Sequence, residues 1–211
     1  MQFSRIITGS VRRTAVAAAV ASLALVGGSA VPASAAVDVA KGATIDTYQD
    51  WTGGAVGQFG NPNSATYGQV ITVPAGKKQV KWFTFYMGGF ESTGLVFRGE
   101  VYGWDGTKAT NAVWESKPVH FDSSVDYQAV KFKAKKAKVK AGQQYVLFAS
   151  VSKDFEQSVP GAVTNWAATG TDVYDGGVFV YQNNGGDEST WTSQSWQQIG
   201  NIDAAMMAQL K

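Results

Sequence analysis

The sequence predicts an all-β fold, and more precisely an antiparallel β-sandwich of the jelly-roll type. Apolar and polar residues alternate with a period of two over most of the chain after residue 64, as in strands with one buried face. Gly, Asn, Asp and Pro interrupt these stretches at short intervals, and no stretch has the 3.6-residue period of an amphipathic helix. In several stretches every second residue is apolar, so that one face of the strand is cleanly apolar. Two sheets packed face to face require such faces.

We expect eight to ten strands, and the clearest of them end at turn residues: 67–74, 79–87, 95–104, 112–116, 127–133, 143–151 and 176–183. The segment 143–151 is apolar on both parities, which indicates a central strand covered on both faces. Asp105-Gly106 predicts a tight hairpin turn, because Gly accepts a positive φ. Residues 202–210 alternate like a closing strand, although their Ala and Met residues also favour a helix.

The first 35 residues have the organisation of a secretory signal peptide. A basic start is followed by a small apolar run, and the run ends at Ala33-Ser34-Ala35, an A-x-A cleavage signature. The run is rich in Ala, is broken by Gly, and is shorter than the roughly 20 strongly apolar residues of a membrane anchor. We therefore expect a secreted protein whose mature chain inserts no segment into a membrane.

Removal of this leader changes the charge. All 16 acidic residues but only 15 of the 18 basic residues lie after residue 35, so the formal net charge falls from +2 to −1. A near-neutral chain does not favour nucleic-acid binding. No repeat or linker divides the remainder, so we expect residues 36–64 to form an N-terminal strand and loop segment of the sandwich and residues 65–211 to form its core.

The Cys and His counts exclude several kinds of active site. Without Cys the chain has no disulfide, thiol nucleophile or cysteine-bound zinc, and its single His, His120, cannot build a multi-histidine metal site. No G-x-S-x-G motif is present, so we expect His120 to be a surface or turn residue rather than a catalytic base. Copper-dependent polysaccharide oxygenases need a His directly after the leader, where this chain has Ala36.

Three motifs resemble those of a group of secreted bacterial β-sandwich proteins of unassigned function. They are FRGEVYGWDGTKAT at 97–110, AGQQYVLF at 141–148 and YDGGVFVYQNNGGD at 174–187. The resemblance covers about residues 65–210 and implies a jelly-roll-like sandwich outside the cytoplasm. Some members of the group carry C-terminal sorting tails, which we do not expect in this protein. The group has no agreed catalytic residues, so none is transferred.

Aromatic residues give the strongest indication of binding. The predicted strands 79–87 and 95–104 each have a second face, opposite the apolar one, that carries aromatic and charged residues. These residues are Trp82, Tyr86, Arg98, Glu100, Tyr102 and Trp104. If these two strands are neighbours, they form an aromatic platform on which sugars stack. Trp191 and Trp196 offer a second candidate on a loop. The alternative is that this parity faces another layer of core, because Trp and Tyr favour strands.

Glu100 is the most suggestive acid for catalysis, because it stands between Arg98 and Tyr102 on one strand face. Glycan hydrolases use two carboxyl groups at a defined separation. The E-x-D-x-x-E pattern of jelly-roll glucanases is absent, and the alternative for Glu100 is a cross-strand ion pair on a solvated sheet face.

Oxygen-rich turns leave a structural calcium site open, with Asp175, Asn183 and Asp187 as its candidate ligands. The same residue types suit hairpin turns, and no EF-hand loop is present. We expect no other cofactor.

Six lysines within ten residues could attract an anionic polymer: Lys131, Lys133, Lys135, Lys136, Lys138 and Lys140. Their alternation with apolar residues instead favours a solvated strand face, on which lysine prevents edge-to-edge aggregation.

The function that we favour from the sequence is a secreted, non-catalytic β-sandwich that binds carbohydrate or another surface component. The alternative is a structural or adhesive protein of the cell envelope, and a glycan hydrolase using Glu100 is less favoured. The ligand and the oligomeric state do not follow from the sequence.

Overall fold

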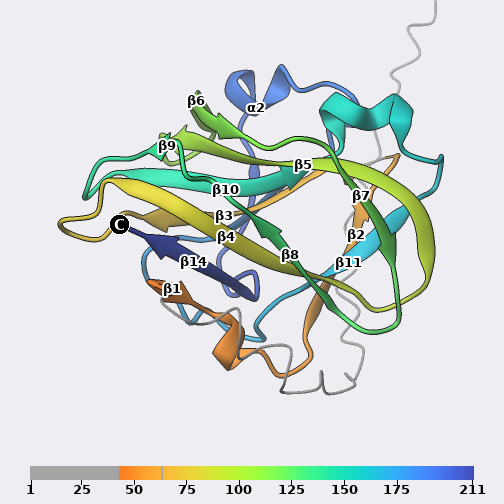
Figure 1. The fold of residues 1–211 in the computed structure, drawn as a ribbon, viewed down its shortest axis with the longest axis horizontal. Helices are drawn as coiled ribbons and strands as arrows, with labels where there is room; N and C mark the ends of the chain where they lie inside the picture. The colour runs from red at the N-terminus through yellow and green to blue at the C-terminus, as the bar shows by residue number, and fades with distance from the viewer. Residues whose placement is uncertain (1–42, 63) are drawn as a thin grey trace, which may run out of the picture.

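The computed structural model describes residues 43–62 and 64–211, which fold as two antiparallel sheets packed against each other (Figure 1). The all-β sandwich expected from the sequence is therefore confirmed. The expected signal peptide lies outside the described residues. No described helix is long and apolar enough to cross a membrane.

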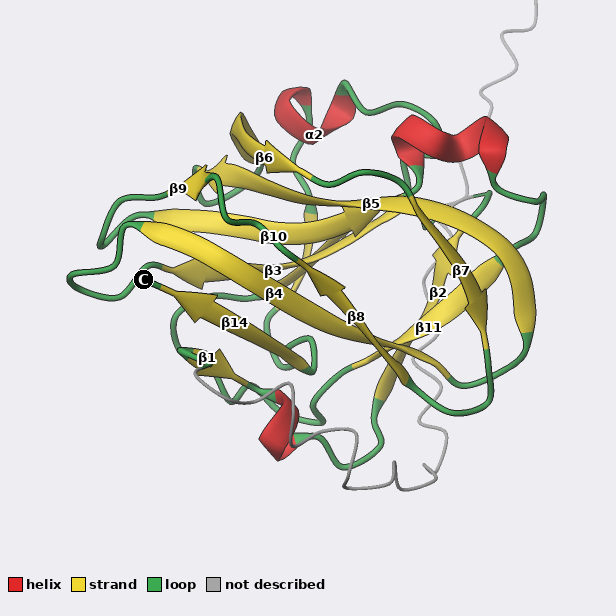
Figure 2. Ribbon diagram, in the orientation of Figure 1, coloured by secondary structure: helices red, strands yellow, loops and turns green. Residues whose placement is uncertain are grey.

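Sheet A has seven strands and contains the first and last strands of the described chain (Figure 2). Its strands in spatial order are β1 (Ile45–Asp46), β14 (Met206–Leu210), β4 (Gln79–Gly88), β11 (Val163–Ala167) and β2 (Ala55–Gly60). Two further strands, β8 (Gln128–Phe132) and β9 (Ala137–Lys138), also pair with β4.

Sheet B also has seven strands. Their spatial order is β13 (Gln197–Ile199), β12 (Phe179–Gln182), β3 (Thr66–Thr72), β10 (Gln144–Ser150), β5 (Ser92–Trp104) and β6 (Ala109–Glu115). The remaining strand, β7 (Val119–Ser123), pairs with the first half of β5. Because β5 is 13 residues long, its second half remains free to pair with β10 and β6.

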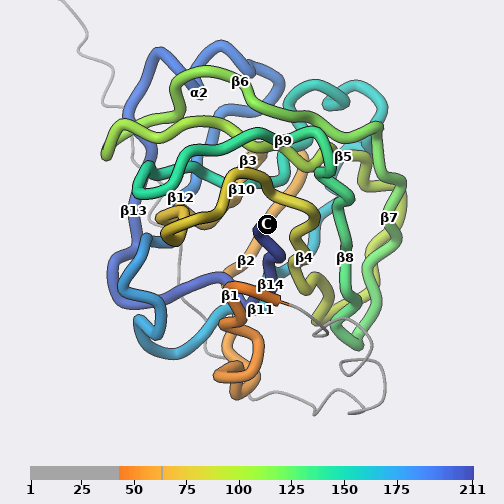
Figure 3. Tube along the Cα trace, turned by 60° about the vertical axis from the view of Figure 1, so that its left-hand side comes forward, coloured from red at the N-terminus to blue at the C-terminus, as the bar shows by residue number. Residues whose placement is uncertain are grey.

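Three short helical segments lie outside the two layers. They are the 3₁₀ segments η1 (Tyr48–Asp50) and η2 (Ser152–Gln157) and the single-turn helix α2 (Thr190–Ser193). Figures 1 and 3 show α2 beside β6 on one side of the molecule and η1 next to β1 on the opposite side. α2 therefore lies over the outer face of sheet B, and η1 lies over the outer face of sheet A.

The described residues form fourteen strands, more than the eight to ten expected. Strands corresponding to the clear alternating stretches are all present, and the closing strand is confirmed over Met206–Leu210. The unexpected strands are short or interrupted: β1 and β9 have two residues each, and the pairing of β11 with β2 shifts register between Thr164 and Trp166. Short or irregular strands carry too little periodicity to be recognised.

The main core lies between the sheets and is built by the apolar parities that the sequence indicated. Phe83, Phe85 and Met87 of β4 face Phe97 and Val101 of β5 within one cluster of buried side chains. Trp166 of β11 is fully buried among these rings, with its ring centroid 4.3 Å from that of Phe85. A core of this size explains how the chain is stable without disulfides.

A second layer of core covers the outer face of sheet B. Val146 and Phe148 of β10 point into it, whereas Leu147 of the same strand points into the main core. The segment around α2 supplies Trp191 and Trp196 as its cover. The expectation that residues 143–151 form a strand covered on both faces is therefore confirmed.

Asp105 and Gly106 form the turn between β5 and β6, as expected. Gly106 has a φ of 103°, and one carboxylate oxygen of Asp105 accepts hydrogen bonds from the backbone N–H groups of Thr107 and Lys108. These bonds lower the pKa of the Asp105 carboxyl.

Candidate functional site

The residues of the expected aromatic platform lie on two different faces of the molecule. β4 belongs to sheet A and β5 to sheet B, so these consecutive strands are not neighbours. Trp82 and Tyr86 consequently lie on the outer face of sheet A, and Tyr102 and Trp104 on that of sheet B. All four side chains are at least nine-tenths buried. The expectation of one exposed platform is wrong, because the chain changes sheet between the two strands.

The tryptophans of the second candidate, Trp191 and Trp196, are also buried, with exposed fractions of 2 % and 4 %. Their rings pack edge-on against Phe148 at centroid distances of 5.0 and 5.2 Å. The indole N–H of Trp191 donates to Thr66 Oγ1 at 3.1 Å. These rings therefore close the second core layer over Tyr102 and do not offer a free surface.

The outer face of sheet A carries an aromatic group that is partly open to solvent. We call it the sheet A aromatic face, and it consists of Tyr48, Trp51, Trp82, Tyr86 and Tyr127. Tyr48 stacks on Tyr86 with 3.8 Å between the ring centroids, and Trp51 packs edge-on against Tyr127 with 5.0 Å between the centroids. Tyr48, Trp51 and Tyr127 are only partly buried.

A charge lies beside these rings. The ammonium of Lys131, on the neighbouring strand β8, is 3.9 Å from the centroid of the Trp82 ring. The indole N–H of Trp82 donates to Gln209 Oε1 at 2.8 Å. Aromatic rings flanked by charged and amide groups are typical of sugar-binding surfaces, because the rings stack on C–H groups while polar groups bind hydroxyls.

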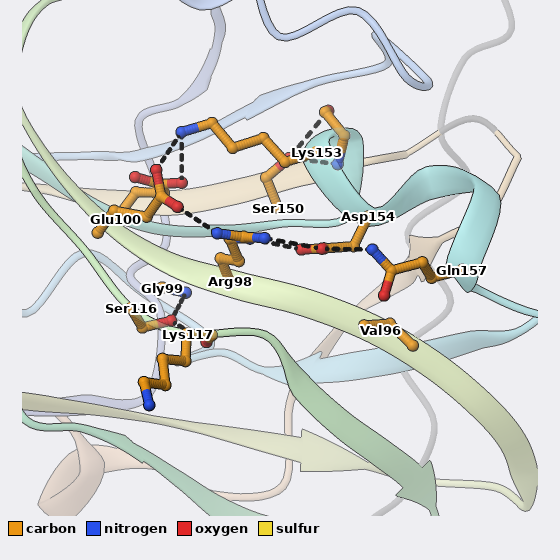
Figure 4. Close-up of polar contacts among 12 residues, drawn as sticks. Val96, Arg98, Gly99, Glu100, Ser116, Lys117, Ser150, Lys153, Asp154 and Gln157 are labelled. Atoms are coloured by element: carbon orange, nitrogen blue, oxygen red, sulfur yellow. Dashed lines mark hydrogen bonds and ion pairs between the residues drawn. The ribbon is translucent and has the colours of Figure 1, made fainter.

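Glu100 lies in a network of charged residues on the outer side of sheet B (Figure 4). Glu100 and Glu115 face each other across β5 and β6, and the ammonium of Lys153 from η2 bridges them. Lys153 Nζ is 3.2 Å from Glu100 Oε1 and 3.6 Å from Glu188 Oε2. Glu100 therefore forms an ion pair, but it is buried rather than on a solvated face, and its partner comes from η2 rather than from a neighbouring strand.

Arg98 completes this network and ties η2 to β5. Its guanidinium donates to both carboxylate oxygens of Asp154, at 2.8 and 3.1 Å, and also contacts Glu115. The Asp154 side chain is fully buried and accepts a further bond from Gln157 at 3.0 Å. Figure 4 shows the Arg98 and Lys153 side chains lying side by side between β5 and η2.

Burial dominates the acid–base behaviour of Glu100. Only 1 % of the residue is exposed, and within the described chain neither carboxylate oxygen has a partner with hydrogen-bond geometry. Desolvation raises the pKa of Glu100 to about 8, against the opposing effect of Lys153. A carboxyl group that is protonated at neutral pH has the chemistry of a general acid, yet a substrate could reach Glu100 only after Lys153 moved aside.

The candidate calcium ligands lie on two separate loops. Asp175 belongs to the loop before β12, whereas Asn183 and Asp187 follow β12. One Asp187 carboxylate oxygen already accepts bonds from the backbone N–H and the hydroxyl of Ser189, at 3.0 and 2.6 Å. No group of three or more His, Asp or Glu side chains suited to a metal ion occurs among residues 43–62 and 64–211. The donor set therefore does not fit a calcium site well.

His120 is exposed on β7, in agreement with the surface position expected for it.

Several residues of these sites escaped sequence reasoning. Lys153 and Asp154 come three and four residues after the end of the apolar strand β10, and two adjacent charges at that point were the available signal. Tyr48 and Trp51 lie before the alternating part of the chain, and Tyr127 begins the strand stretch of β8, so nothing in their spacing connects them to Trp82.

The chain matches no known protein family. No curated protein matches it either.

Proposed function

We propose that this protein is secreted and binds carbohydrate without transforming it, through the sheet A aromatic face. The partly exposed rings of Tyr48, Trp51 and Tyr127 carry the proposal. They come from two chain segments, η1 with the residue after it and the residue directly before β8, and they pack against the buried rings of β4. A sugar would stack on the outer rings while the inner ones hold them in place.

The surroundings of these rings support binding of a polar, uncharged ligand. Trp51 is held by a hydrogen bond of 2.7 Å from its indole N–H to the Gly54 carbonyl, so its ring orientation is fixed before a ligand arrives. The amide oxygen of Gln209 accepts the bond from the Trp82 indole, so only the N–H groups of that amide would serve a ligand. Preorganised rings lose little conformational entropy on binding.

The environment of Glu100 supports a non-catalytic role. A glycan hydrolase places two carboxyl groups on either side of an accessible bond. Here Glu100 is buried, and Glu115 is engaged by both Arg98 and Lys153. These contacts join β5, β6 and η2, as a structural network does.

Secretion rests on the signal-peptide pattern of residues 1–35. N-terminal sequencing of exported protein tests it, with Ala36-Val37-Asp38 expected as the first residues. An exported protein that retains Met1 would contradict it.

Affinity gel electrophoresis against a panel of neutral glycans tests the binding proposal. We expect at least one glycan to retard the mature protein, Trp51→Ala to abolish the retardation and Trp51→Phe to retain part of it. Tyr181→Ala, which removes a partly exposed ring of β12 in sheet B, is the control and should leave retardation unchanged. Thermal melting shows that each variant is folded. No retardation by any glycan, or full retardation of Trp51→Ala, would reject the proposal.

A further inference from the structure

A groove at one end of sheet A is lined by five lysines: Lys77, Lys78, Lys138, Lys140 and Lys211. It has a volume of about 990 Å³, and its walls are the turn between β3 and β4, the turn after β9 and the end of β14. We call it the lysine groove. From the sequence, the run of lysines at 131–140 was interpreted as protection of a strand edge. The fold adds Lys77, Lys78 and Lys211 to that run, which the sequence did not indicate.

Strand pairing concentrates positive charge here. Residues 51–90 and 127–153 contain no Asp or Glu, and together they hold ten of the 15 basic residues that follow residue 35. β4 from the first stretch pairs with β8 and β9 from the second. A chain that is almost neutral overall thus acquires one strongly basic end.

None of these lysines forms an ion pair with an Asp or Glu side chain of the described chain. Every ion pair between described residues involves Arg98 or Lys153, and none involves a lysine of the groove. Grouped like charges without counter-charges destabilise a folded protein through their mutual repulsion. An anionic ligand would relieve that repulsion.

The backbone of the groove is fixed. The N–H groups of Lys78 and Gln79 donate to the main-chain oxygen of Lys211 at 2.6 and 3.1 Å, and Val139 N–H donates to the Lys78 carbonyl at 3.0 Å. The lysine Cα positions are therefore set by main-chain bonds to two neighbouring segments, while the ammonium groups adapt to the ligand.

We propose that the lysine groove binds an anionic polysaccharide, through carboxylate groups repeated along an extended chain. No aromatic residue and no Arg lines the groove, whereas single-stranded nucleic acids are bound by aromatic stacking and phosphates often by the Arg fork. The large exposed hydrophobic residues among those described, Val125, Val159 and Val173, lie elsewhere, so the groove also lacks the apolar contacts of a membrane-binding surface.

The choice of a polysaccharide among polyanions rests partly on the proposed function. Gln79, in the groove, and Trp82, in the sheet A aromatic face, are three residues apart on β4, or roughly 10 Å at the rise of an extended strand. A glycan that leaves the groove along β4 would therefore meet the Trp82 ring and the ammonium of Lys131.

Calorimetric titration with polygalacturonate, a polyanionic glycan, tests this proposal. We expect binding that weakens steeply as the salt concentration rises. The reason is that binding releases the cations that neutralise the polyanion, and added salt opposes this release. Lys78→Gln combined with Lys138→Gln should weaken binding by about tenfold or more. The control, Lys108→Gln combined with Lys117→Gln, removes the same charge elsewhere and should have little effect.

Two further ligands identify what is recognised. Fully methyl-esterified polygalacturonate has the same backbone without charge, and the groove should not bind it. A single-stranded oligothymidylate of matched charge should bind more weakly than polygalacturonate. Equal weakening by both double variants, no binding of polygalacturonate at low salt, or tighter binding of the oligothymidylate would overturn the proposal.

The outcome is separable from that of the proposed function. Trp51→Ala should abolish binding of neutral glycans without changing binding of polygalacturonate. The double variant of Lys78 and Lys138 should weaken binding of polygalacturonate without changing binding of neutral glycans. If the protein binds polygalacturonate through its lysines but no neutral glycan retards it, the lysine-groove proposal would stand and the proposed function would fall.

Discussion

Lys153 contacts two carboxyl groups at once: its Nζ lies 3.2 Å from Glu100 Oε1 and also contacts Glu115, the residue opposite Glu100 on the neighbouring strand. One ammonium from η2 therefore joins β5 and β6 on the outer side of sheet B. Because Glu100 is buried and Glu115 is partly exposed, the two acids respond differently to pH. Burial raises the pKa of Glu100, whereas the hydrogen bonds from Lys153 and Arg98 lower that of Glu115 against desolvation.

Glu100→Gln should flatten the dependence of stability on pH. The pKa of Glu100 is about 8 in the folded protein and near 4.5 when unfolded. Below the lower value both states hold the proton, and between the two values only the folded state does. The free energy of unfolding of the wild type therefore falls as pH rises through this window, by up to roughly 1.4 kcal/mol per pH unit.

Urea unfolding at a series of pH values measures this effect. The stability of Glu100→Gln relative to the wild type should increase from pH 5 to 8, where the variant lacks the penalty of ionising a buried acid. Asp203, whose pKa burial also raises, is present in both proteins and cancels in the difference. Parallel pH profiles would show that Glu100 does not titrate in this way.

Arg98→Lys should destabilise the protein, although it conserves the charge. The guanidinium donates to both oxygens of Asp154, whose side chain is fully buried, and a lysine cannot reproduce this fork. We expect a loss of about 2 kcal/mol in the free energy of unfolding. Gln157→Ala removes a single hydrogen bond from an uncharged amide to the same carboxylate and should cost less, about 1 kcal/mol. Equal losses in the free energy of unfolding for the two variants would show that the two-pronged Arg98–Asp154 contact stabilises the fold no more than the single bond from Gln157.

Gly177→Ala should disrupt the junction between β12 and β3. A Cβ at this position would lie 1.7 Å from the main-chain oxygen of Val70, which cannot move aside as a flexible side chain could. Thermal unfolding should show that the free energy of unfolding falls by at least about 2 kcal/mol.

Gly170→Ala is the matched control for that substitution. A Cβ at Gly170 meets nothing within 4 Å, and its φ lies outside the left-handed region. Its stability should stay close to that of the wild type. A stable Gly177→Ala protein would mean that β12 and β3 lie farther apart than described.

Sequence alone predicted which side of each strand is buried but not which strands are neighbours. Alternation within β4 identified Phe83 and Phe85 as core residues, because the direction of a side chain depends only on its own strand. Whether Trp82 lies beside Trp104 depends on the pairing of whole strands. β4 pairs with β8, β11 and β14, all distant in sequence, and no local pattern encodes that choice.

The charged network shows the same limit. Glu100 stood out because it is an acid on a mostly apolar strand, yet its partners come from other segments. Lys153 reaches it because η2 turns back over β5 after β10 ends. The expected cross-strand ion pair on a solvated sheet face is wrong for Glu100: the residue is buried, Glu115 lies opposite it on β6, and its partner Lys153 comes from η2.

The indole N–H signals of the seven tryptophans in an NMR spectrum provide the most direct test of carbohydrate binding on sheet A. A glycan that retards the protein should shift the signals of Trp51 and Trp82, which lie in the sheet A aromatic face. Signals of Trp191 and Trp196, buried on sheet B, should stay in place. Shifts confined to Trp191 and Trp196, or no shift at a saturating concentration of that glycan, would contradict binding at the sheet A aromatic face.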